Sequence, residues 1–115
     1  MTWKRLCLVN FVEPGSMKIV MVDEVEFLIV RAEDGGFLVV PPTCPHMSAS
    51  LCEGFFDGKL LTCAKHLWQW SVPDATPCGQ AEAELLQYPA EERDGQLYVD
   101  FTSELLYPHQ EAEVE

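Results

Sequence analysis

Two short motifs each combine one cysteine with one histidine. The first is Cys44-Pro45-His46, and the second, Cys63-Ala64-Lys65-His66, follows after sixteen intervening residues. Two thiolates and two imidazoles suit a tetrahedral zinc ion, and they also suit an iron–sulfur cluster in which histidines replace two of four cysteines. A zinc finger usually places two cysteines in one knuckle, whereas each motif here contributes one ligand of each kind. Such mixed loops allow a binuclear centre with both cysteines on one metal and both histidines on the other.

A hairpin is expected to bring the two motifs together. The first motif lies in a proline-rich loop, and the second follows a strand expected over Lys59 to Ala64. Between them stands Asp57-Gly58, a dipeptide that supplies the positive φ angles of tight hairpin turns. We therefore expect this turn to reverse the chain so that the two loops face one another across a single site.

The same dipeptide recurs at Asp34-Gly35 and Asp94-Gly95, and three such turns in a short chain indicate antiparallel strands. Val25 to Val30 is almost continuously apolar, which is typical of a strand covered on both faces. The fold class predicted is all-β, a small sandwich or barrel formed by one domain over residues 1–115. The expected strands are Lys4 to Val9, Met17 to Val22, Val25 to Arg31, Phe37 to Pro41, Lys59 to Ala64, Trp68 to Val72, Leu85 to Glu91 and Leu97 to Phe101.

The charge of the chain excludes some classes of binding partner. Seven Lys and Arg residues against nineteen Asp and Glu residues give a net charge of −12, which argues against binding to nucleic acid or to an anionic membrane surface. The longest apolar runs are far shorter than the roughly 20 residues that span a bilayer. The N-terminal segment lacks the features of a signal peptide, so we expect a cytoplasmic protein. Residues from about Ser103 to Glu115 are expected to form an acidic tail.

The five cysteines are an odd number without a secretory context, which argues against a disulfide framework and for metal or redox use of some of them. Cys7, Cys52 and Cys78 lie outside the two motifs, and we expect them to be small buried or loop thiols.

With these motifs the sequence resembles the Rieske-type ferredoxins, and the resemblance extends through Tyr88-Pro89 to the closing segment from Asp94 to Val99. It implies an antiparallel Rieske-type β-sandwich with a small cluster-binding subdomain at about residues 43–83 and one 2Fe-2S cluster. It also implies that Cys44 and Cys63 bind one iron and that His46 and His66 bind the other. The family's histidines keep their outer ring nitrogens at the surface, where electrons leave.

Departures from the family pattern refine the resemblance. The respiratory members carry a disulfide whose cysteines match Ala49 and Lys65, and a hydroxyl residue that matches Trp68. Their absence implies a low-potential, soluble ferredoxin. The residues around Lys65 and Trp68 are similar to those of the Rieske components of diiron monooxygenases that oxidise toluene or small alkenes. The ferredoxin of a ring-hydroxylating dioxygenase is the alternative.

The chain has a third histidine, His109, which cannot by itself build the iron site of an oxygenase. We therefore expect no enzyme, but a monomeric one-electron carrier between a flavin-containing NAD(P)H reductase and a terminal diiron hydroxylase, both presenting basic rims to this acidic protein. Trp68 and Lys65 are candidates for the docking surface and electron exit, while ordinary core packing is the alternative for Trp68 and Trp70. A zinc-stabilised binding module is the alternative from another functional class.

Overall fold

The computed structural model describes residues 3–42, 54–63, 69–72, 77–78 and 85–100. Within these ranges the regular elements are strands and one short 3-10 helix, and no helix there is long and apolar enough to cross a membrane. The elements are β1 (Trp3–Leu8), η1 (Val9–Phe11), β2 (Ser16–Val22), β3 (Val25–Arg31), β4 (Phe37–Val40), β5 (Phe55–Phe56), β6 (Leu60–Thr62), β7 (Gln69–Ser71), β8 (Pro77–Cys78), β9 (Ala90–Arg93) and β10 (Gln96–Asp100).

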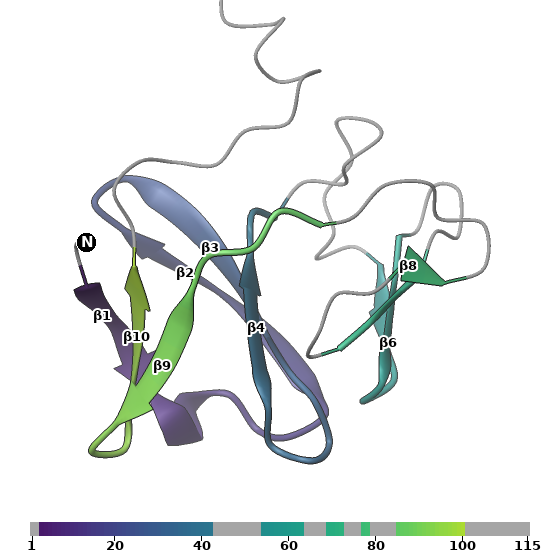
Figure 1. Cartoon of the computed structure of the whole chain (residues 1–115), viewed down its shortest axis with the longest axis horizontal. Helices are drawn as coiled ribbons and strands as arrows, with labels where there is room; N and C mark the ends of the chain where they lie inside the picture. The colour runs from purple at the N-terminus through teal and green to yellow at the C-terminus, as the bar shows by residue number, and fades with distance from the viewer. Residues whose placement is uncertain (1–2, 43–53, 64–68, 73–76, 79–84, 101–115) are drawn as a thin grey trace, which may run out of the picture.

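The strands form three antiparallel sheets, in the orders β1-β10-β9, β2-β3-β4 and β5-β6-β7-β8. In Figure 1 the β2-β3-β4 sheet stands between the other two. Two hydrophobic cores fill the spaces on its two sides, one shared with β1 and β10 and the other shared with β6 and β7. The expected all-β, antiparallel architecture is therefore confirmed.

The middle of β3 and most of β4 are buried on both faces of the middle sheet. Phe27 and Ile29 belong to the core shared with β1 and β10, whereas Leu28 and Val30 belong to the core shared with β6 and β7. All four side chains are completely buried. Each such side chain stabilises the fold by roughly 1.5–3 kcal/mol. The apolar run that predicted a strand covered on both faces is explained by this position.

The turns include one that carries no sequence signal. Asp94 and Gly95 have positive φ angles of 51° and 77° and join β9 to β10, as the dipeptide predicts. Asp23 and Glu24 also have positive φ angles, 52° and 66°, and form the two-residue turn between β2 and β3. Asp23 is held there by an ion pair with Lys4 of β1. Because Glu rarely adopts this conformation, residue type alone did not indicate the turn.

The expected strand from Leu85 to Glu91 begins only at Ala90. Pro89 has no backbone N–H to donate to a ladder, and the preceding residues instead cross from one core to the other. Leu85 packs in the core shared with β6 and β7, while Tyr88 packs in the other core, 4.8 Å from the ring of Phe27. The backbone N–H of Tyr88 donates to the carbonyl of Val39 at 2.9 Å. The segment is thus a strap across β4.

Two strands were not expected at all, and the remaining boundaries differ slightly from the expected ones. β5 and β8 have two residues each, which is too short for periodicity to reveal. β6 and β7 are also shorter than the predicted strands at 59–64 and 68–72. Phe101 and the expected acidic tail lie outside the described residues.

Arg31 ties the 3-10 helix to the middle sheet. Its Nη1 donates to the carbonyl oxygens of Val12 at 3.0 Å and Val9 at 3.4 Å, and its Nε donates to the carbonyl of Gly35 at 3.3 Å. The guanidinium also stacks on Phe37, with 4.7 Å between its central carbon and the ring centroid. One side chain therefore joins three chain segments.

Replacing Arg31 by methionine should keep the packing of the stem and remove every donor. We expect the apparent melting midpoint to fall by about 5–10 °C, because backbone carbonyls in a partly buried position lose their partners. Thermal unfolding followed by circular dichroism measures the change. The control is Arg5→Met at an exposed position of β1. An equal, small shift for both variants would contradict the proposed role of Arg31.

Candidate metal centre

One end of the four-stranded sheet gathers the attachment points of three loops. The strand pairing places Phe55 opposite Thr62, Thr62 opposite Gln69, and Gln69 opposite Cys78. These four residues form one row across the sheet, hereafter the ligand-end row. Residues paired directly across antiparallel strands lie about 4.5–5.5 Å apart, so the row is compact.

The two predicted ligand motifs are connected to this row. Residues 43–53, which contain Cys44 and His46, precede Gly54 and Phe55, and residues 64–68, which contain His66, run between Cys63 and Gln69. Residues 79–84 leave from Cys78 at the same end. Cys44, His46 and His66 themselves lie outside the described residues, as do Lys65 and Trp68. The structure therefore brings together the end of the first ligand loop and both ends of the second, and it describes one of the four predicted ligands.

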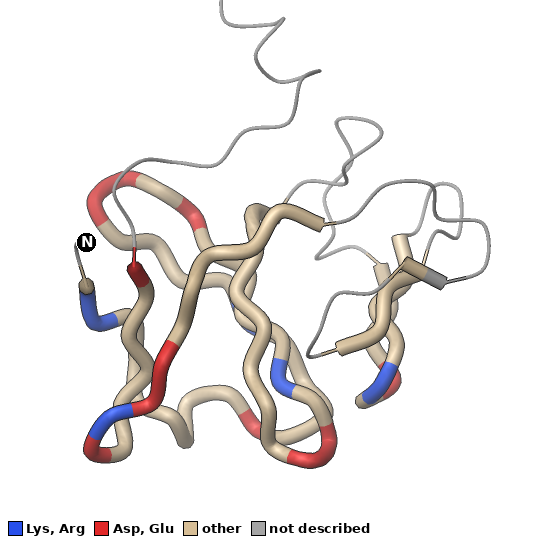
Figure 2. Tube along the Cα trace, in the orientation of Figure 1, with Lys and Arg blue, Asp and Glu red and all other residues tan. Residues whose placement is uncertain are grey.

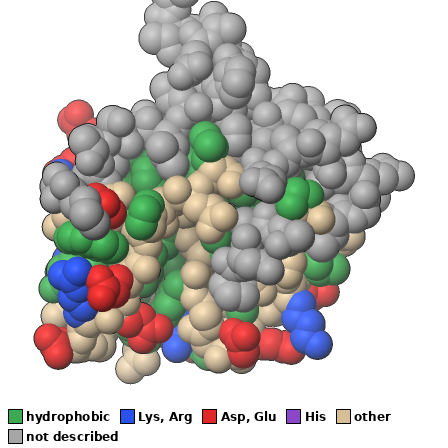
Figure 3. Space-filling view, viewed as in Figure 1, with side chains coloured by type: hydrophobic (Ala, Val, Ile, Leu, Met, Phe, Trp, Pro, Cys, Tyr) green, Lys and Arg blue, Asp and Glu red, His purple; other side chains and the backbone are tan. Residues whose placement is uncertain are grey.

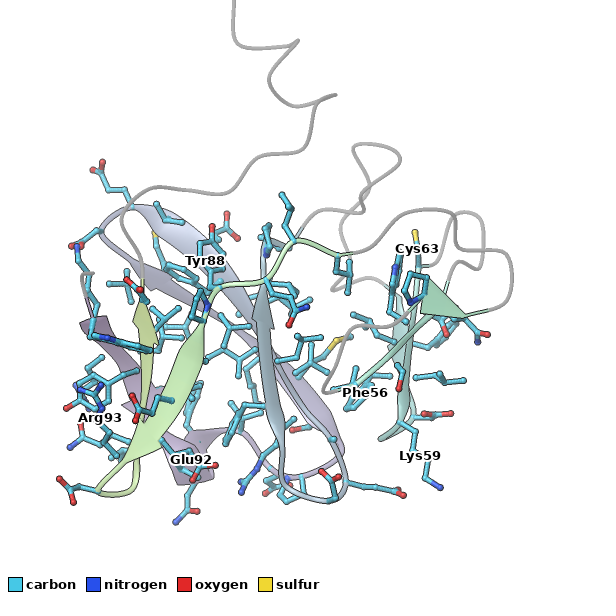
Figure 4. All side chains as sticks on the ribbon, in the orientation of Figure 1. Phe56, Lys59, Cys63, Tyr88, Glu92 and Arg93 are labelled. Carbon is cyan, nitrogen blue, oxygen red and sulfur yellow. The ribbon has the colours of Figure 1, made fainter. Side chains whose placement is uncertain are left out.

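That ligand, Cys63, is completely buried and directly follows β6. It packs in the same core as Leu61, Trp70 and Leu85. Figure 4 places Cys63 at one end of the β5-β6-β7-β8 sheet, hereafter the small sheet, and Lys59 at the other. Cys63 is a free thiol, and no disulfide competes for it. A buried thiolate ligand at the junction of strand and loop fits a protected 2Fe-2S cluster, and it also fits zinc.

Trp70 packs in a core, and Cys7 is a small buried thiol, as expected from the sequence for each of them. Trp70 is completely buried in the core shared with β6 and β7, so core packing is confirmed for it. Cys7 is buried in the other core, on the far side of the middle sheet from Cys63. Burial raises the pKa of the Cys7 thiol, and the nearby Arg5 only partly opposes this effect. A buried, protonated thiol is a poor ligand and a poor nucleophile. Cys52 lies outside the described residues.

The turn at the opposite end of the sheet is the one predicted at Asp57-Gly58, and the side-chain carboxylate of Asp57 holds it. Asp57 Oδ1 accepts hydrogen bonds from the backbone N–H of Leu60 at 2.8 Å and of Lys59 at 2.9 Å. These bonds lower the pKa of Asp57 below its usual value. Asp57 thus closes the loop between β5 and β6, the strand that leads into Cys63. The Asp-Gly dipeptide predicted the turn, and the tendency of Asp side chains to bond the backbone two or three residues later explains how its carboxylate holds it.

Gly58 joins this turn to the middle sheet. It has a φ of +103°, and its carbonyl accepts a hydrogen bond from the backbone N–H of Glu33 at 2.9 Å. A Cβ at this position would lie 3.0 Å from Glu33 Oε2. Lys59 pairs with the Glu33 carboxylate at 3.4 Å, but both side chains are largely exposed, so this ion pair adds little. The backbone bond is therefore the main polar link between the two turns.

Comparison with known proteins gives consistent matches along the chain. A family model described as "Rieske [2Fe-2S] domain" matches residues 2–89. The chain is 37% identical to the methanesulfonate monooxygenase ferredoxin subunit of Methylosulfonomonas methylovora, an alignment that covers 96% of this chain and 90% of that protein. It is 34% identical to the ferredoxin component of the alkene monooxygenase system of Xanthobacter autotrophicus (strain ATCC BAA-1158 / Py2), over 82% of this chain and 77% of that protein.

A solved structure with the same fold is a chain from the complex of reduced oxygenase and oxidized ferredoxin in carbazole 1,9a-dioxygenase. The TM-score is 0.74 at 27% sequence identity, and the superposition covers 90% of this chain and 97% of that chain. The fold of this chain is thus similar to the fold of a protein of nearly the same length.

Substitution of Asp57 tests whether its two hydrogen bonds stabilise the fold. Asp57→Ala should lower the melting midpoint, whereas Asp57→Asn should preserve most of it because the amide oxygen can accept the same two bonds. Since folding lowers the pKa of Asp57, its stabilisation is full above the usual carboxyl pKa and is lost as the pH falls through the lowered value. Melting midpoints of both variants and the wild type, measured from neutral pH down through the lowered pKa of Asp57, check the effect of the substitutions and the pH dependence. Equal loss in the two variants would contradict the hydrogen-bonding role.

Proposed function

The chain belongs to the Rieske [2Fe-2S] domain family, and from this premise we propose that it is a one-electron carrier between a flavin-containing NAD(P)H reductase and a terminal monooxygenase. Its relatives are ferredoxin components rather than enzymes. The observation that carries the proposal is the family match over residues 2–89, a range that contains both motifs.

We assign one 2Fe-2S cluster to Cys44 and Cys63 on one iron and to His46 and His66 on the other. The first ligand loop ends at the ligand-end row and the second begins and ends there, which supports this assignment, as does the buried thiol of Cys63. When bound, the cluster accepts and donates one electron at a time, at a potential raised by its neutral imidazole ligands. The protein's part is to hold the four ligands and to keep the cysteine side away from water.

The terminal partner is a diiron hydroxylase of the alkene or toluene type in this proposal. The 34% identity to an alkene monooxygenase ferredoxin supports it. A sulfonate monooxygenase is a second candidate, supported by the higher identity and longer coverage of the methanesulfonate monooxygenase ferredoxin. A ring-hydroxylating dioxygenase is the third candidate for the terminal partner, since the carbazole 1,9a-dioxygenase system contains a protein of the same fold as this chain.

The partners dock at the ligand end in this proposal, because an electron must pass between two centres that lie close together. Charged residues of the small sheet stand at the Asp57 turn, and its described residues near the ligand-end row carry no charge (Figure 2). Acidic and basic side chains lie along the lower edge and the left side of the face in Figure 3. Trp68 and Lys65 stay candidates for the electron exit.

The acidic composition of the chain bears on the surfaces of its partners. The net charge of −12 supports reductase and hydroxylase surfaces with basic rims. A monomer suits a carrier that presents one face to two partners in turn. A cytoplasmic location, where NAD(P)H is available, completes the proposal.

Low-temperature EPR of the dithionite-reduced protein, together with iron and zinc analysis, tests the cofactor. A rhombic signal with a low average g value and two irons per chain supports the proposal. One zinc and no signal would replace it with a zinc-stabilised binding module. Reconstitution with purified reductase and each class of hydroxylase then separates the terminal partners, because only the matching hydroxylase should turn over.

Replacing His66 by cysteine tests the ligand assignment. The variant should keep a cluster, but its potential should fall from the range of about −150 to +300 mV towards the roughly −400 mV of all-cysteine ferredoxins, and its EPR spectrum should change. The matched control is His109→Cys, which replaces a histidine outside the motifs and should leave both unchanged. Unchanged potential and spectrum in His66→Cys would exclude His66 as a ligand.

Replacing Phe55 by alanine tests docking at the ligand end. Phe55 is 66% exposed and lies in the ligand-end row, and exposed aromatic side chains often anchor protein interfaces. We expect the KM for the ferredoxin in hydroxylase turnover to rise about tenfold while the reduction potential stays constant. Met21→Ala on β2 is the matched control, since Met21 is 62% exposed in a different sheet. Equal KM values for the two variants would argue against docking at this end.

A further inference from the structure

Thr62 is unusual among the residues that the structure describes. It is the one polar or charged residue among them that is buried, at 9% exposure. It ends β6 and stands immediately before Cys63. A buried hydroxyl is costly unless it is hydrogen-bonded, so its placement beside a ligand calls for a partner.

The partner is Gln69. Its Nε2 donates to Thr62 Oγ1 at 3.1 Å, across the pair that the sheet register also joins. Cross-strand partners share a face, so both side chains lie on the face opposite to Leu61 and Trp70, which fill the core. The bond thus lies on the outer face of the sheet, at the ligand-end row.

This pair closes the base of the second ligand loop. The six residues 63–68 lie between Thr62 and Gln69, and they contain both Cys63 and His66. β6 and β7 have only three residues each, so few backbone bonds hold the two ends of the loop together. Short strand ends open readily, and a side-chain bond at the last pair opposes such opening.

We propose that Thr62 and Gln69 are positioning residues for the cluster, and that their hydrogen bond fixes the spacing between the two ends of the second ligand loop. The inference rests on the proposed function, because it assigns the pair a role towards the ligands Cys63 and His66. Neither residue touches the metal in this proposal. Their bond keeps the loop from spreading, which slows ligand detachment and keeps one geometry at the irons.

The test is a double-mutant cycle of Thr62→Val and Gln69→Leu on the loaded protein. Valine keeps the branched shape of threonine and lacks only the hydroxyl. The readout is the rate at which the visible absorbance of the cluster bleaches in excess iron chelator, well below the melting midpoint. Each single variant should bleach about fivefold faster than the wild type, the factor expected for one hydrogen bond. The double variant should be no faster than either single variant, because both remove the same bond.

Two further measurements separate positioning from general stability. Ser16→Ala is the matched control, since Ser16 Oγ donates to the carbonyl of Glu13 at 2.6 Å and lies in the β2-β3-β4 sheet. It should change the melting midpoint without changing the bleaching rate. The EPR lines of reduced Thr62→Val should broaden as the ligand geometry becomes less uniform, whereas those of Ser16→Ala should not.

Bleaching of Thr62→Val no faster than that of Ser16→Ala would overturn the inference, and so would rates that multiply in the double variant. Failure of the proposed function is distinct from either result, because a wild-type protein without iron or an EPR signal has no cluster to bleach. A wild-type protein with a normal cluster and unaffected variants would leave the carrier function standing and remove only the positioning role.

Discussion

The fold depends on two adjacent strands, β3 and β4, whose side chains are buried on both faces of their sheet. β3 and β4 must supply apolar side chains in both directions, because one face meets β1 and β10 and the other meets the small sheet. Phe27 to Val30 satisfy this requirement with four consecutive buried residues. Two cores are then joined through one set of strands, so the sheet that carries Cys63 rests on the same strands that anchor the N- and C-terminal ones. A rigid support of this kind is what a preorganised ligand site needs.

The register of the strands in the small sheet determines where the first ligand loop ends and where the second begins and ends. Its four strands are very short, yet their register aligns Phe55, Thr62, Gln69 and Cys78 in one row, and the chain segments with the predicted ligands begin or end there. At the opposite end, Asp57 closes the turn between β5 and β6, and the carbonyl of Gly58 in that turn accepts a hydrogen bond from the backbone N–H of Glu33. The polar link to the scaffold and the ligand loops therefore lie at opposite ends of the sheet.

Sequence patterns predicted the features that are strong and local. The Asp-Gly turns, the doubly covered strand and the family all followed from residue type and spacing. The Asp23-Glu24 turn, the two-residue strands β5 and β8, and the strap from Leu85 to Tyr88 did not, because tertiary packing decides them. The ligand roles of Cys44, His46 and His66 stay predictions, since these residues lie outside the described ranges. The Thr62 and Gln69 pair becomes visible only when register and burial are known.

The pairing of β1 with β10 has a consequence for how the protein is made. The partners of β1 stand more than eighty residues later, with Trp3 opposite Asp100, whereas the strands of the small sheet pair with neighbours close in the chain. Local pairings form early and distant ones late, because closing a long loop costs more entropy. During synthesis the hairpin around Asp57 can therefore form before β10, the partner of β1, has been synthesised. The small sheet at the ligand end is therefore expected to form early, and the pairing of β1 with β10 is expected to form last.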